Sequence, residues 1–363
     1  MDAPSEPDQT PAAPGRKLAD GRQLPKLLFA TSKDRLRNKI GPAADDVFQL
    51  LSDAGQSLLD ISDHDKPWLE VGAASSGVDG VVLLGGYDVV RSQRLDVLTD
   101  VLRKAGSCLP DLDDYIVWSD DCFGDTDGDG LPEIPVSRIP DAGSADFLLD
   151  ILCCPTGTAQ SSRFGIRNSA RPYADNVFNA ITGNEAINIS APFAVGHTQK
   201  NHIDAAGIYM VLHGSKHDQS MFWGEDSSGT HLQAFSLGCI PDGLSGVVFS
   251  GACWGALCVE KPATDTPDGT QAVPLKTTQS IALRFLEAGA TTYVGATGAH
   301  YSPISGAIHH KFWEGVMGGT PPAKALFDAK AYFAPHVYTW PNADEYGYMF
   351  KTWRQFTCLG FGW

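Results

Sequence analysis

Short apolar runs alternate with stretches of helical periodicity along most of this chain, and that alternation limits the folds open to it. Residues 81–86 form an apolar run that ends in two glycines, as a buried strand does, and Leu95, Leu98, Val101 and Leu102 then recur at helical spacing. Strands that alternate with helices predict an α/β fold, a mostly parallel sheet covered by helices on both faces. Further strand candidates are residues 115–118, 134–136, 163–169, 193–195, 207–212, 246–250 and 291–294, and further helix candidates are residues 146–152, 175–181, 278–288, 304–316 and 322–333.

Length and sequence breaks indicate how the chain is divided. Its 363 residues are enough for one large domain or two joined subdomains. Residues 1–22 are rich in Pro, Ala, Asp and Gly without periodicity, which predicts a disordered lead-in. A break after Cys153 and Cys154 predicts a boundary between a smaller amino-terminal α/β subdomain at 23–155 and a second subdomain at 160–363.

Charge and cysteine usage argue against several classes of protein. The 27 Lys and Arg residues against 43 Asp and Glu residues give a net charge of −16, which disfavours binding to nucleic acid or to anionic membranes. The chain has no run of about 18 apolar residues, so we expect no membrane insertion. The first residues show no secretory leader pattern, and the eight cysteines form no CxxC pair. We therefore expect a cytoplasmic protein with reduced thiols.

Reactive side chains follow two of the predicted strands. The run at 207–212 leads directly into His213 and Gly214, and the run at 246–250 leads into Gly251, Ala252 and Cys253. If these strands are neighbours in a parallel sheet, His213 and Cys253 emerge side by side at one edge. A histidine there can lower the pKa of the thiol and later protonate a leaving amine, while the backbone N–H groups of Gly214 and Cys253 stabilise an oxyanion. The pattern predicts a Cys253/His213 catalytic dyad.

Four stretches of sequence resemble a known family. The motifs YMVLHG at 209–214, followed by FWG at 222–224, and VFSGACWG at 248–255 are similar to those of the caspase-like clan of cysteine peptidases, and within it to the gingipain-type (peptidase C25-like) family. The acidic segment at 118–140 and the stretch at 288–303 are similar to other parts of that family. The resemblance covers roughly residues 80–360. It implies a caspase-like catalytic subdomain and a cysteine endopeptidase that acts on protein or peptide substrates.

The chain departs from the family at two places. The family often ends in a Leu-Gly-Asp-Pro stretch, whereas this chain keeps Leu-Gly and ends in Phe361, Gly362 and Trp363. An acidic residue that would orient the catalytic histidine is not identifiable, because Ser169 stands near the expected position. The resemblance therefore gives a dyad and not a triad.

The clan's substrate pocket corresponds here to residues 169–175 and 299–302. By that resemblance Tyr301 forms a wall of the pocket and Trp223 contributes to substrate binding. Asp175 is the predicted charged selector, which would favour Arg or Lys before the scissile bond, because a carboxylate in a dry pocket discriminates for the opposite charge. Arg171 in the same stretch would instead select Asp or Glu. The sequence leaves open which of the two points inward.

An acidic turn follows residue 124. Asp125, Asp127 and Asp129 with Gly130 match the first six positions of a calcium loop, and Glu133 fits its ninth position, but Val136 stands at the twelfth. The alternatives are a structural calcium site and a solvated acidic turn. No cofactor is expected to be required for catalysis.

Two other functions fit parts of the sequence. Residues 251–255 also match a G-x-C-x-G nucleophile elbow, as in cysteine variants of α/β-hydrolases or amidohydrolases, which would use a downstream Asp328 and His336. A degenerate peptidase fold could instead serve as a binding module. The polar loop at 259–276 is either a processed or gating segment or a passive surface loop.

Overall fold

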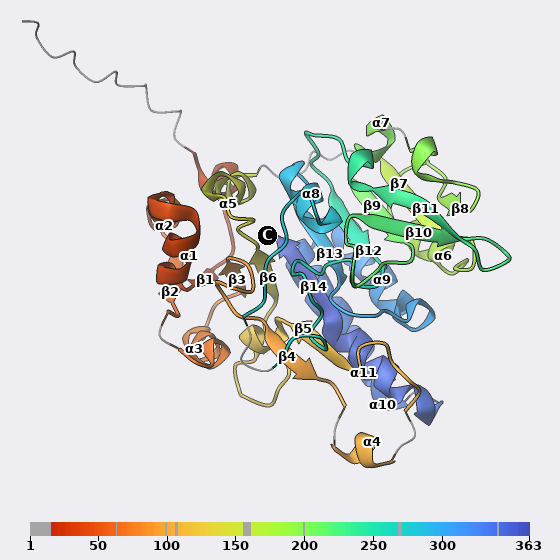
Figure 1. The fold of residues 1–363 in the computed structure, drawn as a ribbon. Helices are drawn as coiled ribbons and strands as arrows, with labels where there is room; N and C mark the ends of the chain where they lie inside the picture. The colour runs from red at the N-terminus through yellow and green to blue at the C-terminus, as the bar shows by residue number, and fades with distance from the viewer. Residues whose placement is uncertain are drawn as a thin grey trace, which may run out of the picture.

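A ten-stranded sheet forms the centre of the molecule in the computed structural model, which describes residues 16–62, 64–98, 100–105, 108–154, 161–198, 200–267, 271–339 and 341–363 (Figure 1). Its strand order is β2-β1-β3-β6-β14-β13-β12-β9-β7-β8. These strands are β1 Leu27–Thr31, β2 Ser57–Asp60, β3 Gly80–Leu84, β6 Val136–Ile139, β7 Arg163–Asn168, β8 Asn188–Ser190, β9 Gly207–Val211, β12 Val247–Ser250, β13 Thr292–Ala296 and β14 Phe356–Gly360. Two hairpins lie outside it, β4 Gln93–Asp96 with β5 Ile116–Ser119 and β10 Met221–Glu225 with β11 His231–Ser236.

The sheet consists of two parallel halves that run in opposite directions. Strand β14, near the carboxyl terminus, pairs parallel with β6 and antiparallel with β13, and every other neighbouring pair in this sheet is parallel. The end of the chain therefore lies in the middle of the sheet, between its first and second halves (Figure 1). Consequently the carboxyl ends of β9 and β12 lie at the edge opposite to those of β1 and β3.

Helices surround this sheet, and about half of those in the described residues overlap the helices predicted from the sequence. The α-helices are α1 Lys33–Ile40, α2 Ala44–Asp53, α3 Pro67–Ala74, α4 Asp100–Ala105, α5 Ala145–Leu152, α6 Ala174–Phe178, α7 Lys200–Ile203, α8 Ile281–Glu287, α9 Ser302–Met317, α10 Pro322–Thr339 and α11 Tyr346–Gln355. Short 3₁₀ helices span Leu18–Gly21, Gly41–Ala43, Asp121–Gly124, Val195–His197, Leu237–Cys239 and Ala343–Glu345. Pro322 begins α10, where a missing N–H group leaves no bond unmade.

One apolar core extends across both halves of the sheet. Every residue of β3, β9, β13 and β14 is buried, which explains why the central strands are apolar without alternation. The largest fully buried side chains include Phe29 in the first half and Phe249 and Trp313 in the second. The fold class predicted from the sequence, a mostly parallel sheet flanked by helices, is confirmed.

Three local predictions are wrong. Residues 193–195 form no strand, because the edge strand β8 lies earlier, at Asn188–Ser190. Leu95 belongs to strand β4 and only the later part of the predicted helix is helical, at α4. The strand expected at 134–136 begins at Val136, since Pro135 has no N–H group to donate to a sheet.

The structure bears on part of the remaining predictions about organisation. Residues 16–22 of the predicted disordered lead-in are ordered, because Leu18–Gly21 form a 3₁₀ helix in which Leu18 and Ala19 are buried. Residues 1–15 of the lead-in and residues 155–160 at the predicted boundary lie outside the described residues, so the division at 155–160 stays a prediction. All eight cysteines are free thiols. Among the described residues, the structure contains no helix with the length and apolar character needed to span a membrane.

Candidate active site

The carboxyl ends of β9 and β12 bring His213 and Cys253 to the same edge of the sheet. These strands pair in parallel with Met210 opposite Ser250, and each reactive residue follows its paired residue by three positions. The backbone of Gly214 packs directly on the backbone of Cys253, because a Cβ at Gly214 would overlap the Cys253 carbonyl oxygen. A glycine is therefore required after the histidine for the two turns to approach this closely. The expectation that the two strands are neighbours is confirmed.

A tight turn presents the half-buried Cys253. Trp254, the next residue, has a φ of 51°, in the left-handed region that side chains rarely adopt. Its backbone N–H donates to Gly298 O at 2.9 Å, and its indole Nε1 donates to Asp113 Oδ1 at 3.1 Å. These bonds hold the unusual conformation, and strain of this kind is concentrated at functional sites.

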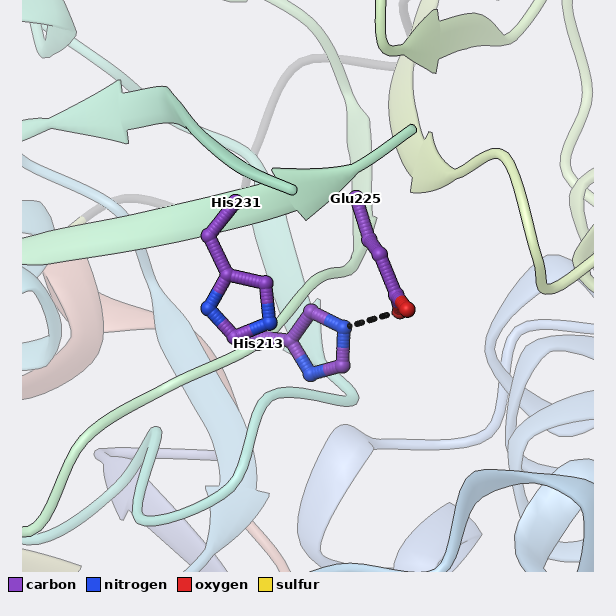
Figure 2. A group of neighbouring side chains, drawn as sticks. All are labelled: His213, Glu225 and His231. Carbon is purple, nitrogen blue, oxygen red and sulfur yellow. Dashed lines mark hydrogen bonds and ion pairs between the residues drawn. The ribbon is translucent and has the colours of Figure 1, made fainter. Parts of the chain in front are cut away.

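His213 is held by the hairpin β10–β11. It forms an isolated antiparallel bridge with Trp223, with N–O distances of 2.7 and 2.9 Å. Two residues further along β10, Glu225 Oε2 lies 2.8 Å from His213 Nε2 (Figure 2). The His231 ring, from the start of β11, stacks on the His213 ring with centroids 4.7 Å apart. Glu225 therefore binds one ring nitrogen of His213, Nε2.

Glu225 is the site residue that the sequence analysis missed. Ser169, which stands near the position expected for the acid, donates its hydroxyl to the Glu225 carbonyl oxygen. Asn168 Nδ2 approaches Glu225 Oε2 at 3.5 Å. The signal that could have found Glu225 is the turn sequence Asp226-Ser-Ser-Gly229, which predicts a hairpin between the segments on either side of it.

The thiol and the imidazole are both neutral in the free protein. Burial raises the pKa of the Cys253 thiol. Burial also lowers the pKa of His213, and it outweighs the hydrogen bond with Glu225, which acts in the opposite direction. The hydrogen bond with His213 lowers the pKa of Glu225. Desolvation thus disfavours the charged form of both groups, and the expectation that His213 lowers the pKa of the thiol stays a prediction.

Two further histidines lie behind Cys253 in the core. The His300 backbone N–H donates to Cys253 Sγ at 3.2 Å, and its side-chain Nε2 lies 2.5 Å from Ser305 Oγ. His309 stacks on His300 with ring centroids 5.3 Å apart, and its Nδ1 lies 2.8 Å from the Tyr209 hydroxyl. Burial lowers the pKa of His300 to about 3 and that of His309 well below its ordinary value. Both rings are neutral at pH 7.

A buried ionic cluster supports the nucleophile turn from the first half of the chain. Lys351 Nζ lies 2.8 Å from both carboxylate oxygens of Asp111 and 2.8 Å from Asp113 Oδ2. Asp113 also accepts from the Ala299 backbone N–H and from the Trp254 indole. The predicted pocket wall, Tyr301, donates its hydroxyl to Asp111 Oδ1 at 2.8 Å. The cluster thus links two loops to α11, the turn that carries Cys253 and Trp254 and the loop at 299–301 that follows β13.

The two candidate selector residues differ in their surroundings. Both oxygens of Asp175 are bound by Arg167, at 2.6 and 2.9 Å, which neutralises this carboxylate on α6. Arg171 follows β7 at the same edge as His213. Burial and hydrogen bonding contribute most to the pKa shifts of Cys253, His213, Glu225 and His300. The positive charge of Arg171 also contributes to these four shifts, but less than Lys351 and Asp113 do at Cys253 and less than His231 does at His213. Arg171 is therefore a cation that acts on both Cys253 and His213, as Lys351 also acts on Cys253. The prediction that Asp175 is the selector is not favoured.

The acidic turn lies between the 3₁₀ helix at Asp121–Gly124 and β6. Oxygens of Asp125, Asp127, Asp129 and Glu133 all lie within 4.8 Å of one another. Several of these oxygens already accept backbone N–H groups, such as Gly128 N to Asp125 Oδ1 at 2.7 Å. Calcium binding here stays a prediction from the sequence.

The residues of the alternative hydrolase mechanism lie on α10. Lys324 Nζ binds both oxygens of Asp328, at 2.8 and 2.9 Å. His336 is exposed, and its Nδ1 lies 3.1 Å from the Tyr332 carbonyl oxygen one turn earlier. Neither contact brings these residues to Cys253, so the structure gives this alternative no support.

Solved structures share this architecture. The arginine-specific cysteine proteinase gingipain R (RgpB) matches over 95% of this chain and 79% of its own, with a TM-score of 0.59 and 10% identity. The complex of the RgpB pro- and mature domains from Porphyromonas gingivalis matches over 93% and 78%, with a TM-score of 0.61 and 10% identity. A structure described as a protease matches over 93% and 77%, with a TM-score of 0.54 and 12% identity. No family model matches the chain, and no curated protein does. The chain has the caspase-like fold of gingipain, as the sequence predicted.

Proposed function

We propose that the protein is a cysteine endopeptidase that uses Cys253 as nucleophile and His213 as general acid and base. The observation that carries this proposal is the pairing of β9 with β12, which sets the His213–Gly214 turn against the backbone of Cys253. The caspase-like fold shared with cysteine proteinases supports the same reaction class. Its substrates would be proteins or peptides, and a cytoplasmic location stays a prediction.

The resting state consists of a thiol and a neutral imidazole, so activation occurs with substrate bound. His213 Nδ1 takes the thiol proton as the sulfur attacks the carbonyl carbon of the scissile bond. The backbone N–H groups of Gly214 and Cys253 stabilise the oxyanion. The imidazolium then gives its proton to the leaving amine, and the bond to that amine breaks to leave a thioester. A water molecule, deprotonated by His213, hydrolyses the thioester and restores the thiol.

Glu225 would serve as the positioning residue in this mechanism. Its carboxylate would accept from His213 Nε2–H, which fixes the ring, keeps Nδ1 free to take a proton and stabilises the imidazolium that forms during the reaction. Ser169 and Asn168 in turn contact Glu225 from the end of β7. The chain would thus complete a triad with an acid from the hairpin.

For substrate selection, we assign the charged contact to Arg171 in place of Asp175. The Arg167 pair leaves Asp175 without an unpaired oxygen, whereas Arg171 acts electrostatically on the dyad. A cation at this place favours Asp or Glu before the scissile bond. Tyr301 and Trp223 remain the proposed apolar contacts.

The decisive experiment is the Cys253→Ala variant with peptide libraries as substrates. It should lose all peptidase activity and keep the circular dichroism spectrum of the parent, while Cys258→Ala and Cys239→Ala keep activity. Labelling with a peptidyl electrophile should modify Cys253 only, and His213→Ala should prevent it. Retained peptide hydrolysis in Cys253→Ala would refute the proposed nucleophile.

A further inference from the structure

The side chains of three potential metal ligands project from one face of the small antiparallel ladder that His213 forms with β10 and β11. His213 is bridged to Trp223, and Glu225 lies two residues along β10 from Trp223, so its side chain lies on the same face. His231 on β11 is the register partner of Glu225. The ladder therefore gathers two imidazoles and a carboxylate beside the sheet edge, as Figure 2 shows.

The donor atoms of these side chains are already close together. One ligand atom from each of His213, Glu225 and His231 lies within 4.8 Å of the other two. A tetrahedral zinc ion with bonds of about 2.1 Å needs ligand atoms about 3.4 Å apart, so small side-chain rotations would complete the site. His231 is exposed at the start of its strand, and His213 and Glu225 are each about a quarter exposed, at 27% and 25%. An ion can therefore reach the three residues from solvent.

The proposed peptidase mechanism gives His231 no role, although its ring lies against the catalytic histidine. Two histidines and one glutamate form the ligand set that zinc uses in open sites, where a water molecule completes the coordination. Glu225 and His213 are 2.8 Å apart around a shared proton, and a metal ion can replace that proton. The set lacks the all-oxygen character that calcium or magnesium requires.

We propose that His213, Glu225 and His231 form a zinc site that reversibly inhibits the enzyme. With the proposed function as its premise, inhibition follows because a His213 ring bound to zinc is no longer held by Glu225 alone and cannot act as the general base. Arg171 contributes positive charge at both His213 and Glu225, which opposes a divalent cation and limits the affinity. We therefore expect reversible binding and not a permanent structural metal.

Zinc binding is tested first without reference to activity. Isothermal titration of the full chain with zinc chloride should give one saturable site, and cobalt(II) should give the visible absorption of a tetrahedral complex. His231→Asn and Glu225→Gln should each weaken zinc binding by a factor of 10 or more. The matched control is His217→Asn, which removes an exposed imidazole from the loop before β10. Circular dichroism verifies that each variant is folded.

The outcomes separate the site from the proposed function. No saturable binding, or binding unchanged in both His231→Asn and Glu225→Gln, overturns the zinc site. If zinc binds as expected in a protein that hydrolyses no peptide, the site stands and the peptidase proposal fails. With an active protein, zinc should inhibit the parent and His217→Asn at the concentrations that saturate the site, and His231→Asn should need at least 10-fold more. Equal inhibition of the parent and His231→Asn overturns the inhibitory role.

Discussion

The paired histidines behind the nucleophile make stability depend on pH in a calculable way. His300 and His309 are buried and neutral when the protein is folded, with a pKa of about 3 for His300 and one well below the ordinary 6.5 for His309. In the unfolded chain both rings take up protons as the pH falls through about 6.5. Because the unfolded state then binds more protons, stability is fully present above this pH and is lost as the pH falls. The window opens near pH 6.5 and continues downward toward 3 for His300.

The size of the loss follows from proton linkage. Between pH 7 and pH 5, each buried neutral histidine lowers the free energy of unfolding by about 2 kcal/mol, so the pair lowers it by about 4 kcal/mol. Replacing His309 by asparagine keeps a polar atom near the Tyr209 hydroxyl and removes one titrating group. Its smaller side chain costs stability equally at both pH values. The pH-dependent loss should therefore fall to about 2 kcal/mol in His309→Asn.

Urea unfolding followed by tryptophan fluorescence at the two pH values measures this difference. The matched control is His310→Asn, which changes the next residue of α9, a half-exposed histidine near Glu314. It should keep the pH-dependent loss of the parent. Ordinary carboxyl groups titrate mainly below pH 5 and are common to all three proteins. An equal loss in the parent and in His309→Asn would refute the neutral buried pair.

Three further predictions concern the site and its support. Glu225→Gln should lower kcat about 10-fold to 100-fold with little change in KM, because the ring of His213 loses its anionic partner; steady-state kinetics measures this, and an unchanged kcat contradicts the positioning role. Lys351→Met should lower the free energy of unfolding by about 3–5 kcal/mol, since it leaves buried carboxylates unpaired. Chemical denaturation measures this loss, and adding Asp111→Asn should restore part of it. A loss of free energy below about 1 kcal/mol would contradict a buried ionic cluster. Arg171→Ala should lower kcat/KM for peptides with Asp or Glu before the scissile bond by a factor on the order of 10 or more, and Asp175→Ala should not; a fluorogenic library that prefers Arg or Lys would reverse the assignment.

The sequence predicts the parts of this molecule that depend on local pattern. Central strands such as β9 and β12 are buried on both faces, so they appear as apolar runs, and the reactive residues that follow them are visible as His213-Gly214 and Cys253. The pairing of strands that lie far apart in the sequence is harder to predict from it. The reversal of the sheet at β14 depends on how α11 returns the chain between β6 and β13, and nothing in the five residues of β14 encodes its direction.

The partners of charged residues were the hardest features to predict. Asp175 and Arg171 lie four positions apart and fit a pocket equally well in the sequence, yet Arg167 from β7 binds Asp175. Glu225 was missed because its role requires the hairpin to fold back so that Trp223 meets His213. A one-dimensional motif cannot show which side chain a carboxylate will meet across two elements.

The opposite direction of the two half-sheets gives the first half of the chain a structural role at the site. Its strands end at the far edge, so it cannot contribute residues that follow β1 or β3 to the dyad. It reaches the site instead through Asp113, which lies just before β5 and binds both Trp254 and Ala299. The φ of 51° at Trp254 is unfavourable for a tryptophan, and the contact with Asp113 is one of those that hold it. Because Lys351 of α11 neutralises Asp113, the helix that leads into the central strand β14 also stabilises the turn that carries Cys253, the proposed nucleophile. The geometry of Cys253 therefore depends on both halves of the chain, although both residues of the proposed dyad come from the second.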